Sequence, residues 1–170
     1  GGGGGGLPFY ALMPEVAERL GNVVTRRDIR GRTDFRSVLT VTIDGETARD
    51  FDDAITLERL PNGHHWLGVH IADVASFIAQ GGPLDVEAIR RGNSVYLPRR
   101  VIPMLPEVLS ADVCSLRGGV DRLAVSVFIE LDPSGQVHGR RYERTRVRCS
   151  DGLSYEQVQA VLDGDGSVSP

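Results

Sequence analysis

The chain has 170 residues, of which 41% are hydrophobic and 25% are charged, and this balance is typical of one folded domain with a buried core. Residues 1–6 are all glycine, which indicates a tag or a placeholder, and the remaining glycines form no collagen-like repeat. No apolar run approaches the roughly 20 residues that cross a bilayer, and the apolar stretch near the start is too short for a secretory leader. The sequence therefore predicts no membrane association and a cytoplasmic location.

Cysteine and charge content exclude further classes of protein. Cys114 and Cys149 lack the CxxC spacing of thiolate zinc sites and are too few for a disulfide scaffold, so we expect both to be buried thiols. The net charge of −4 argues against attraction of nucleic acid by the whole surface. All 19 basic residues are arginine, which reflects either GC-rich codon usage or a need for guanidinium groups that bind phosphate.

The first half of the chain predicts one helix and three strands. Residues 7–32 form an expected N-terminal helical segment, in which PEVAERLG at 14–21 has proline at its start and glycine at its end. Alternation of apolar and polar residues predicts strands over 35–44, 51–59 and 64–74. The PNG turn between the last two strands predicts an antiparallel hairpin.

A second short helix is predicted over residues 83–92, which again begin with proline and end with glycine. Its apolar face would carry Leu84, Ala88 and Ile89. The following residues 96–106 contain three prolines, a number that excludes both a helix and a central strand. We therefore expect an extended loop there.

The last third of the chain predicts another hairpin and a final helix. Residues 122–131 and 137–148 alternate in polarity and are joined by a PSG turn. Ser154 and Gln157 have the spacing of a capping box, so the final helix begins at Ser154. The predicted fold class is α+β, with a mixed, largely antiparallel sheet and flanking short helices.

Two further sets of polar residues lie on predicted strands. His70 and Asp73 are three positions apart and would point to opposite faces, so we interpret both as structural. In the strand 137–148, alternate positions place arginines and a tyrosine on one face, which suits either an RNA phosphate track or a solvated strand edge. These residues are Arg140, Tyr142, Arg144, Arg146 and Arg148.

The strongest functional signal is the run DGETARDFDD at residues 44–53. It contains four aspartates, Asp44, Asp50, Asp52 and Asp53. Because like charges this close destabilise a fold, we expect a cation among them, with a solvated acidic turn as the alternative. Carboxylates without histidine or cysteine nearby suit Mg²⁺ or Mn²⁺, and the spacing does not fit a calcium-binding EF-hand loop. Arg49 lies within the run and would neutralise it in part or contact phosphate.

Strand geometry predicts how these aspartates converge. Asp44 ends one predicted strand, and a short loop leads to the start of the next. Side-chain alternation places Asp50 and Asp52 on one side of the second strand and Asp53 on the other. Such a cluster would hold one or two metal ions about 3.5 to 4 Å apart, as in hydrolytic nucleases.

The run VTIDGETARDFDDAI closely resembles the signature of the ribonuclease II and ribonuclease R family, whose catalytic module is the RNB domain. Further resembling motifs follow in order: HIADV, RGNSVYLP, VIPMLPEVLS, CSLRGGVDRLAVSV and LSYEQV. Together they span roughly residues 33–162. Residues 33–170 are therefore predicted to be the front portion of an RNB domain.

The resemblance implies a magnesium-dependent, processive 3′→5′ exoribonuclease that hydrolyses single-stranded RNA to nucleoside 5′-monophosphates, with Mn²⁺ as a substitute ion. It assigns all four aspartates to the catalytic metal site. Asp44, Asp50 and Asp53 would be the main ligands, and Asp52 would be closest to the chemical step through positioning of the metal or the water. Tyr96 would stack on a base near the RNA 3′ end, a contact that suits an enzyme indifferent to sequence.

Departures from the family pattern leave other functions open. The family's RNB domain is about twice as long, and its cold-shock and S1 RNA-binding domains have no counterpart here. We expect the remaining RNB half, and those domains, as partners within a larger enzyme. The alternative is a noncatalytic RNA-binding or regulatory fragment, and a third interpretation is a structural domain that binds metal but no RNA.

Overall fold

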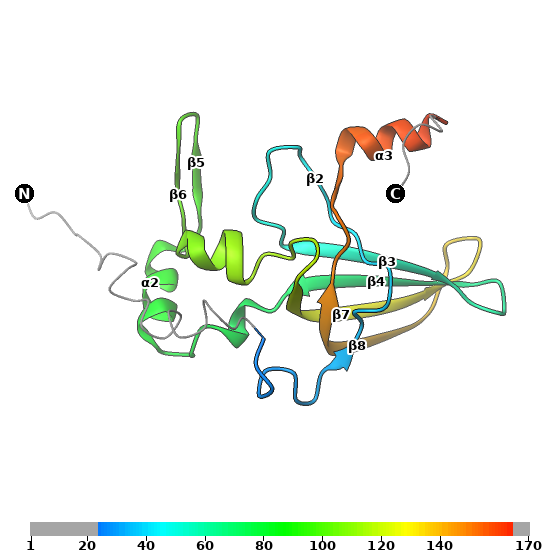
Figure 1. The fold of residues 1–170 in the computed structure, drawn as a ribbon, viewed down its shortest axis with the longest axis horizontal. Helices are drawn as coiled ribbons and strands as arrows, with labels where there is room; N and C mark the ends of the chain where they lie inside the picture. Colours follow the sequence, from blue (N-terminus) through cyan, green and yellow to red (C-terminus); the bar gives the residue numbers. More distant parts are fainter. Residues whose placement is uncertain (1–23, 165–170) are drawn as a thin grey trace, which may run out of the picture.

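The computed structural model describes residues 24–164, and its centre is a five-stranded sheet (Figure 1). The strands are β1 (Thr33–Asp34), β3 (Asp53–Arg59), β4 (His65–Ala72), β7 (Asp121–Leu131) and β8 (Val137–Arg148). Their order is β1-β8-β7-β4-β3, with β1 parallel to β8 and all other neighbours antiparallel. The predicted mixed, largely antiparallel sheet and the α+β class are confirmed.

Both predicted hairpins are confirmed. β3 pairs with β4, and β7 pairs with β8 along nearly their whole lengths. The two connecting turns contain Gly63 and Gly135, whose φ angles are +84° and +86°. Glycine is favoured at both positions because a Cβ atom destabilises this left-handed backbone.

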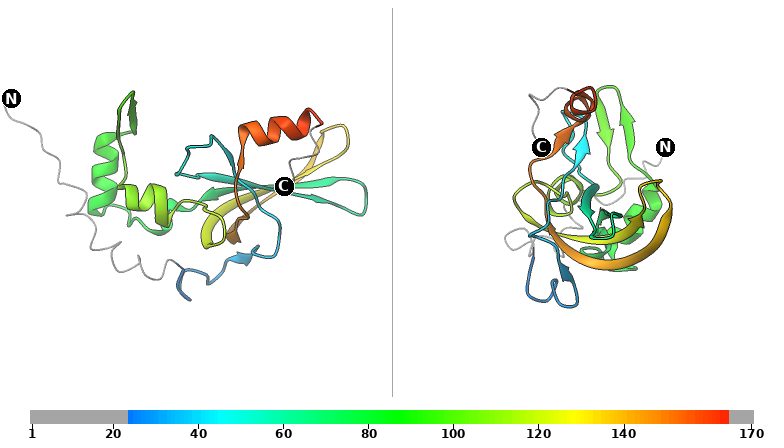
Figure 2. Two further views of the ribbon diagram at one scale, coloured as in Figure 1. Left: turned by 45° about the horizontal axis from the view of Figure 1, so that its top comes forward. Right: turned by 90° about the vertical axis from the view of Figure 1, so that its right-hand side faces the viewer.

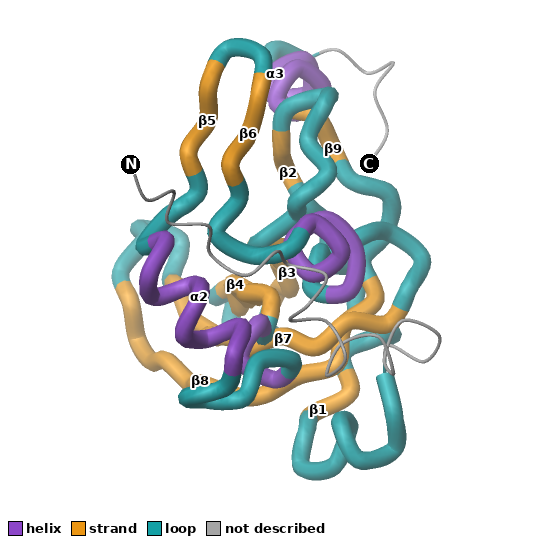
Figure 3. The backbone as a smooth tube through the Cα atoms, turned by 90° about the vertical axis from the view of Figure 1, so that its left-hand side faces the viewer, coloured by secondary structure: helices purple, strands orange, loops and turns teal. Residues whose placement is uncertain are grey.

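The other elements stand around the sheet. They are β2 (Ile43–Asp44), the 3-10 turn η2 (Val74–Ser76), α2 (Pro83–Arg91), β5 (Val95–Leu97), β6 (Arg100–Ile102), the π-helical turn η3 (Val108–Val113), β9 (Leu153–Ser154) and α3 (Tyr155–Leu162). β2 and β9 form a parallel pair, and β5 and β6 form a separate hairpin. Figures 1 and 3 show that the β5–β6 hairpin, β2 and α3 rise on the same side of the sheet.

Both predicted helices in the described part of the chain form. α3 begins with the expected capping box, in which Gln157 N donates to the hydroxyl of Ser154 and the Gln157 side chain accepts from Ser154 N. α2 has the predicted ends, and Leu84 of its predicted apolar face is buried, but Ile89 is not. Ile89 is 73% exposed, whereas Glu87 is buried beneath two arginines that pair with it.

Two segments differ from the predictions. Of the expected strand over 35–44, only residues 43–44 form a strand, β2. The reason is that the chain turns at Phe35 and then crosses the sheet. On this path the Thr40 hydroxyl lies 3.0 Å from the Thr56 hydroxyl. The expected loop over 96–106 contains the β5–β6 hairpin. Its prolines do not interrupt the strands because Pro98 lies in the turn and the others follow β6.

The N-terminal predictions fall mostly outside the described residues. The expected helix over 14–21 lies there, and residues 24–32 form hydrogen-bonded turns. Within residues 24–164, no helix has the length and apolar character needed to span a membrane.

The core has two parts. One packs the sheet against Leu116 and Cys149, with Phe35 and Phe51 lying over it. The other lies between η2, α2, η3 and the start of β7, and it includes Cys114. Both cysteines are buried as predicted, and burial raises the pKa of Cys114 to about 12 and that of Cys149 to about 11, so neither is a reactive thiolate.

A chain of hydroxyl groups crosses the buried face of the sheet. His70 is fully buried, and its ring nitrogens lie 2.9 Å from the Thr56 hydroxyl and 2.6 Å from the Ser126 hydroxyl. Asp73 is bound by Arg32 at 2.5 Å and by the hydroxyl of Ser76. Both residues thus have structural partners, as expected. Asp73 does not lie on the strand with His70, however, because β4 ends at Ala72 and Asp73 precedes η2.

The opposite face of the sheet carries aliphatic side chains that no described element covers. Leu57, Ile71 and Val125 are 64%, 49% and 42% exposed. The strand register places all three on one face, together with half-buried Val69 and Val127. The sheet is strongly curved (Figure 2). One of its faces packs on the core, and the other is exposed to solvent within the described chain.

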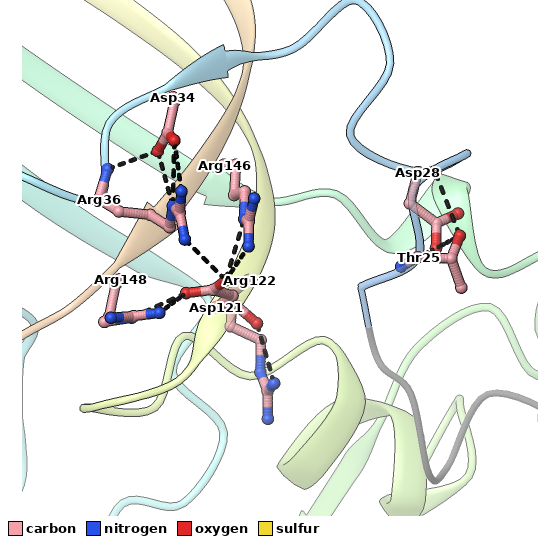
Figure 4. A network of polar contacts seen from close by, with 8 residues as sticks. All are labelled: Thr25, Asp28, Asp34, Arg36, Asp121, Arg122, Arg146 and Arg148. Atoms are coloured by element: carbon pink, nitrogen blue, oxygen red, sulfur yellow. Dashed lines mark hydrogen bonds and ion pairs between the residues drawn. The ribbon is translucent and has the colours of Figure 1, made fainter.

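At the end of the sheet where β1 meets β8, acidic residues are paired with arginines (Figure 4). We call Asp34, Arg36, Asp121, Arg146 and Arg148 the arginine network. The Asp121 carboxylate binds Arg146 and lies 2.6 Å from Arg148 and 3.5 Å from Arg36. Two arginines of the predicted stripe on β8 are thus structural, whereas Tyr142 is 69% exposed.

Candidate active site

The four aspartates lie on one segment, residues 44–53, which we call the aspartate segment. Asp44 is the last residue of β2, and Asp53 is the first residue of β3. Asp50 and Asp52 lie in the intervening loop. The structure thus places all four at one end of the sheet, near the start of its edge strand β3. The predicted alternation of Asp50 and Asp52 against Asp53 on one strand is wrong, because β3 begins only at Asp53.

β2 is held in place by the chain just before α3. Leu153 N donates to the Thr42 carbonyl at 2.8 Å, and Ser150 N donates to the Thr40 carbonyl at the same distance. The two segments approach so closely that a Cβ atom on Gly152 would lie 2.5 Å from the hydroxyl oxygen of Thr42. Glycine at 152 therefore allows β9 to lie against β2 and to position Asp44.

The carboxylates of the aspartate segment act on one another. Burial raises the pKa of Asp44, and the charges of Asp53 and Asp50 raise it further. Burial also raises the pKa of Asp52, with added contributions from Asp50, Asp53 and Asp44. The structure brings all four within electrostatic range, and their mutual repulsion favours a cation.

No basic side chain of residues 24–164 forms an ion pair with any of the four aspartates. The Oδ2 atom of Asp44 is buried and has no hydrogen-bond partner among the described residues. A buried carboxylate oxygen without a donor is costly unless a cation or water satisfies it. These oxygen ligands suit a hard divalent ion such as Mg²⁺.

The aspartates are not preassembled around a metal position. In the described part of the chain, no group of three His, Cys, Asp or Glu side chains has a geometry that could hold a metal ion. The residue types and their mutual repulsion nevertheless fit a divalent cation.

Tyr96 shares a pocket with Asp50. The pocket has a volume of about 390 Å³ and lies between the β5–β6 hairpin and the aspartate segment. It is lined by Arg49, Asp50, Ser94, Tyr96, Val101, Pro103, Glu107, Ser110 and Ala111. Tyr96 is 69% exposed, so its ring is available for stacking. The structure thus brings together two predicted site residues that are 46 positions apart in the sequence.

Asp44 lines a different pocket, of about 340 Å³, between the aspartate segment and the start of α3. Gly152, Ser154 and Gln157 contribute to its wall. The aspartate segment therefore separates two hollows, one beside Tyr96 and one beside α3.

The sequence analysis did not identify the residue whose side chain binds the backbone of the aspartate segment. Ser115 lies in the CSLRGG motif, and its hydroxyl contacts the backbone of Arg49 and Phe51. No local spacing predicts this contact, because it joins residues more than 60 positions apart. The only sequence signal was the motif itself.

Four carboxylates without a basic partner in the described chain lie at one end of a curved sheet, and Asp50 shares a pocket with an exposed tyrosine. This arrangement defines a candidate site for a divalent cation. Comparison with known families is more specific. The family model of the RNB domain matches residues 32–170. The chain belongs to the RNB domain family.

Similar proteins agree with this membership. Ribonuclease R of Thermotoga maritima is 45% identical over 166 residues, which cover 95% of this chain and 23% of that protein. The solved structure of Mycoplasma genitalium RNase R with ribose-methylated single-stranded RNA has a TM-score of 0.77 and 30% identity, covering 93% of this chain and 27% of that one. Yeast Ssd1, described as a pseudonuclease, shares the fold with a TM-score of 0.75 and 24% identity, covering 86% of this chain and 18% of that one.

The chain spans 19–31% of the length of the first relatives it matches. The activity, substrates and partners of the whole protein are therefore proposals.

Proposed function

We propose that this chain is the aspartate-bearing part of a magnesium-dependent 3′→5′ exoribonuclease that hydrolyses single-stranded RNA to nucleoside 5′-monophosphates. The observation that carries this proposal is the cluster of four carboxylates without a basic partner in the described chain, beside the pocket that Asp50 shares with Tyr96. The similarity to ribonuclease R supports the exoribonuclease class. Magnesium, the 3′→5′ direction and the product follow from the family resemblance.

Each site residue has a role in this proposal. Asp44, Asp50 and Asp53 would hold Mg²⁺, with Mn²⁺ as a substitute. When bound, the ion would lower the pKa of a water molecule and offset negative charge on the scissile phosphate. Asp52 would share in binding the ion and would orient the attacking water.

Tyr96 would position the RNA. Its exposed ring on β5 would stack on a base near the 3′ end, and every base offers a suitable face. Because Tyr96 and Asp50 line the same pocket, a stacked nucleotide would present its phosphate towards the aspartate segment.

The partners proposed within the larger protein are the remaining RNB half and, from relative length alone, cold-shock and S1 domains. The exposed aliphatic face of the sheet supports the first of these, since a contiguous exposed apolar patch marks a surface that another domain or protein covers. The cytoplasmic location stays a prediction.

The second candidate is a noncatalytic RNA-binding or regulatory protein. It is supported by the shared fold of yeast Ssd1, a protein described as a pseudonuclease. All four aspartates of the family signature are present here, which favours the enzyme.

The test uses the full-length protein that contains this chain, with 5′-labelled single-stranded RNA and a circular RNA of the same sequence. We expect Mg²⁺-dependent shortening of the linear RNA from its 3′ end, release of nucleoside 5′-monophosphates, and no cleavage of the circle. RNA binding without cleavage would establish the noncatalytic function. Metal binding without RNA binding would establish a structural metal domain.

A further inference from the structure

Ser115 forms hydrogen bonds with the backbone of the aspartate segment. Its side chain is buried, with 1% exposure. The hydroxyl accepts a hydrogen bond from Phe51 N at 3.0 Å and donates one to the carbonyl of Arg49 at 3.0 Å. One hydroxyl group thus holds the backbone on both sides of Asp50.

Two backbone hydrogen bonds extend this support to Asp52. Leu116 N donates to the Phe51 carbonyl at 2.9 Å, and Ala72 N donates to the Asp52 carbonyl at 2.9 Å. The backbone of residues 49–52 is therefore tied at four groups. Of these ties, the two made by the Ser115 hydroxyl are the ones that a side-chain substitution removes.

Arg122 holds Ser115 in turn. This arginine is buried, with 3% exposure, and its guanidinium donates to the carbonyls of Ser115 at 2.8 Å and Asp112 at 3.1 Å. A third bond reaches the carbonyl of Asp121 at 3.1 Å (Figure 4). The planar guanidinium thereby fixes the turn between η3 and β7 that carries Ser115.

We propose that Ser115, held by Arg122, is a positioning residue of the active site and sets where Asp50 and Asp52 stand. The proposal rests on the proposed function, because it concerns the same carboxylates. Four like charges push the aspartate segment apart. The Ser115 hydroxyl opposes this spreading, so its loss lowers metal affinity and turnover more than it lowers the stability of the fold.

A purely structural role is the competing explanation, and Ser126 provides the matched control. Its hydroxyl is also 1% exposed and has two short partners, His70 at 2.6 Å and Thr145 at 2.6 Å. These contacts lie within the sheet, and none of them reaches the aspartate segment. Ser126→Ala therefore removes a comparable buried hydroxyl without releasing Asp50.

The experiment compares Ser115→Ala, Ser115→Cys and Ser126→Ala in the full-length protein. For each variant, Mn²⁺ affinity is measured by titration calorimetry, and kcat, RNA Kd and melting temperature are measured in parallel. We expect Ser115→Ala to lose about 10- to 100-fold in Mn²⁺ affinity or kcat, the usual effect of removing a partner that orients metal ligands. RNA Kd should stay within about twofold, because no RNA contact is removed.

The cysteine variant should lose only part of the Mn²⁺ affinity and kcat, because a thiol keeps the approximate size of the hydroxyl but is a weak hydrogen-bond donor. Ser115→Cys should fall between the parent and Ser115→Ala, and it supplies the test if the alanine variant does not fold. Ser126→Ala should lower the melting temperature and leave Mn²⁺ affinity and kcat unchanged. Equal losses of activity in Ser115→Ala and Ser126→Ala, or unchanged Mn²⁺ affinity and kcat in both Ser115 variants, would overturn the proposal.

Failure of the proposed function gives a different result. A parent protein that binds Mn²⁺ but does not degrade RNA would refute the nuclease, while the Mn²⁺ affinities would still decide the role of Ser115. A parent that binds no Mn²⁺ would overturn both proposals.

Discussion

Two groups of carboxylates in this protein have opposite surroundings. In the arginine network, Asp34 binds Arg36, and the hydrogen bond from that arginine lowers the pKa of Asp34 far below its usual range. Burial opposes ionisation of Asp121, but hydrogen bonds from Arg146 and Arg148 still lower its pKa. In the aspartate segment, burial and neighbouring carboxylates raise the pKa of Asp44 and of Asp52.

The carboxylates of the arginine network stabilise the fold, whereas those of the aspartate segment are available to bind a ligand. Arginine partners satisfy the first group within the protein, so it offers little to a ligand. The second group costs stability as it stands, and a bound cation would remove that cost. Unpaired charge near a pocket is thus a better indication of a site than acidic content alone.

The largest expected effect is that of metal removal. EDTA should abolish RNA degradation by the full-length protein, and Mg²⁺ or Mn²⁺ should restore it, because the carboxylates need a cation. At an ion concentration of 100 times Kd, binding should stabilise the fold by about 2.7 kcal/mol, measured by thermal unfolding. Asp121→Asn should show the same response to metal. Degradation that continues in EDTA would contradict the mechanism.

Replacement of Asp52 by asparagine should reduce kcat by at least about 100-fold, because the side chain keeps its shape but loses the charge that orients water. RNA Kd, measured by fluorescence anisotropy, should change by less than about twofold. Equal losses in kcat and in RNA affinity would instead identify Asp52 as a binding residue.

Tyr96→Ala should weaken RNA binding by about 1 to 3 kcal/mol, the contribution of one stacked base. Tyr142→Ala is its matched control, since both rings are 69% exposed on strands and only Tyr96 shares a pocket with an aspartate of the site. Neither variant should melt earlier than the parent. A loss of RNA affinity in Tyr142→Ala alone would move the RNA path to β8, and a lower melting temperature of Tyr96→Ala at unchanged RNA affinity would indicate a packing role.

Asp121→Asn should lower the free energy of unfolding by about 1 to 3 kcal/mol, because charged hydrogen bonds to Arg146 and Arg148 are lost. Without metal at neutral pH, Asp52→Asn should instead stabilise the fold and raise the melting temperature, since it removes a negative charge that its neighbours repel. Thermal unfolding of both variants in EDTA measures these two changes in stability. Destabilisation by Asp52→Asn would show that its carboxylate is satisfied within the fold.

The smallest expected effect concerns pH. Because the pKa of Asp121 is lowered in the folded state, its stabilisation is present above the ordinary value of 3.8 and is lost as the pH falls through the folded pKa. Because the pKa of Asp52 is raised, ionisation of Asp52 costs stability above its folded pKa, and acidification towards 3.8 relieves that cost. Urea unfolding between pH 3 and 7 should therefore show a weaker acid loss in Asp121→Asn and a steeper one in Asp52→Asn. Identical pH profiles of the two variants would contradict the contrast.

Local sequence determined much of the structure. Turn residues at PNG and PSG, strand alternation, and the capping box at Ser154 predicted two hairpins and the start of α3, because each depends on residues only a few positions apart. Residue type and spacing also identified the aspartate segment as a candidate site, since clustered carboxylates suit a cation whatever the fold. Tyr96 was identified only through the resemblance to the family. The expected strand over 35–44 failed, because alternation does not show that the chain leaves the sheet at Phe35.

Tertiary structure alone decided how the site is held. The pairing of β2 with β9, the contact of Ser115 with the backbone around Asp50, and the choice of Asp121 as partner for Arg146 and Arg148 join residues 25 to 110 positions apart. Nothing in the spacing of such residues encodes their contact. Long-range pairs form only after the strands dock and bury their apolar faces, and that packing determines which carboxylates meet an arginine and which stay free for a cation.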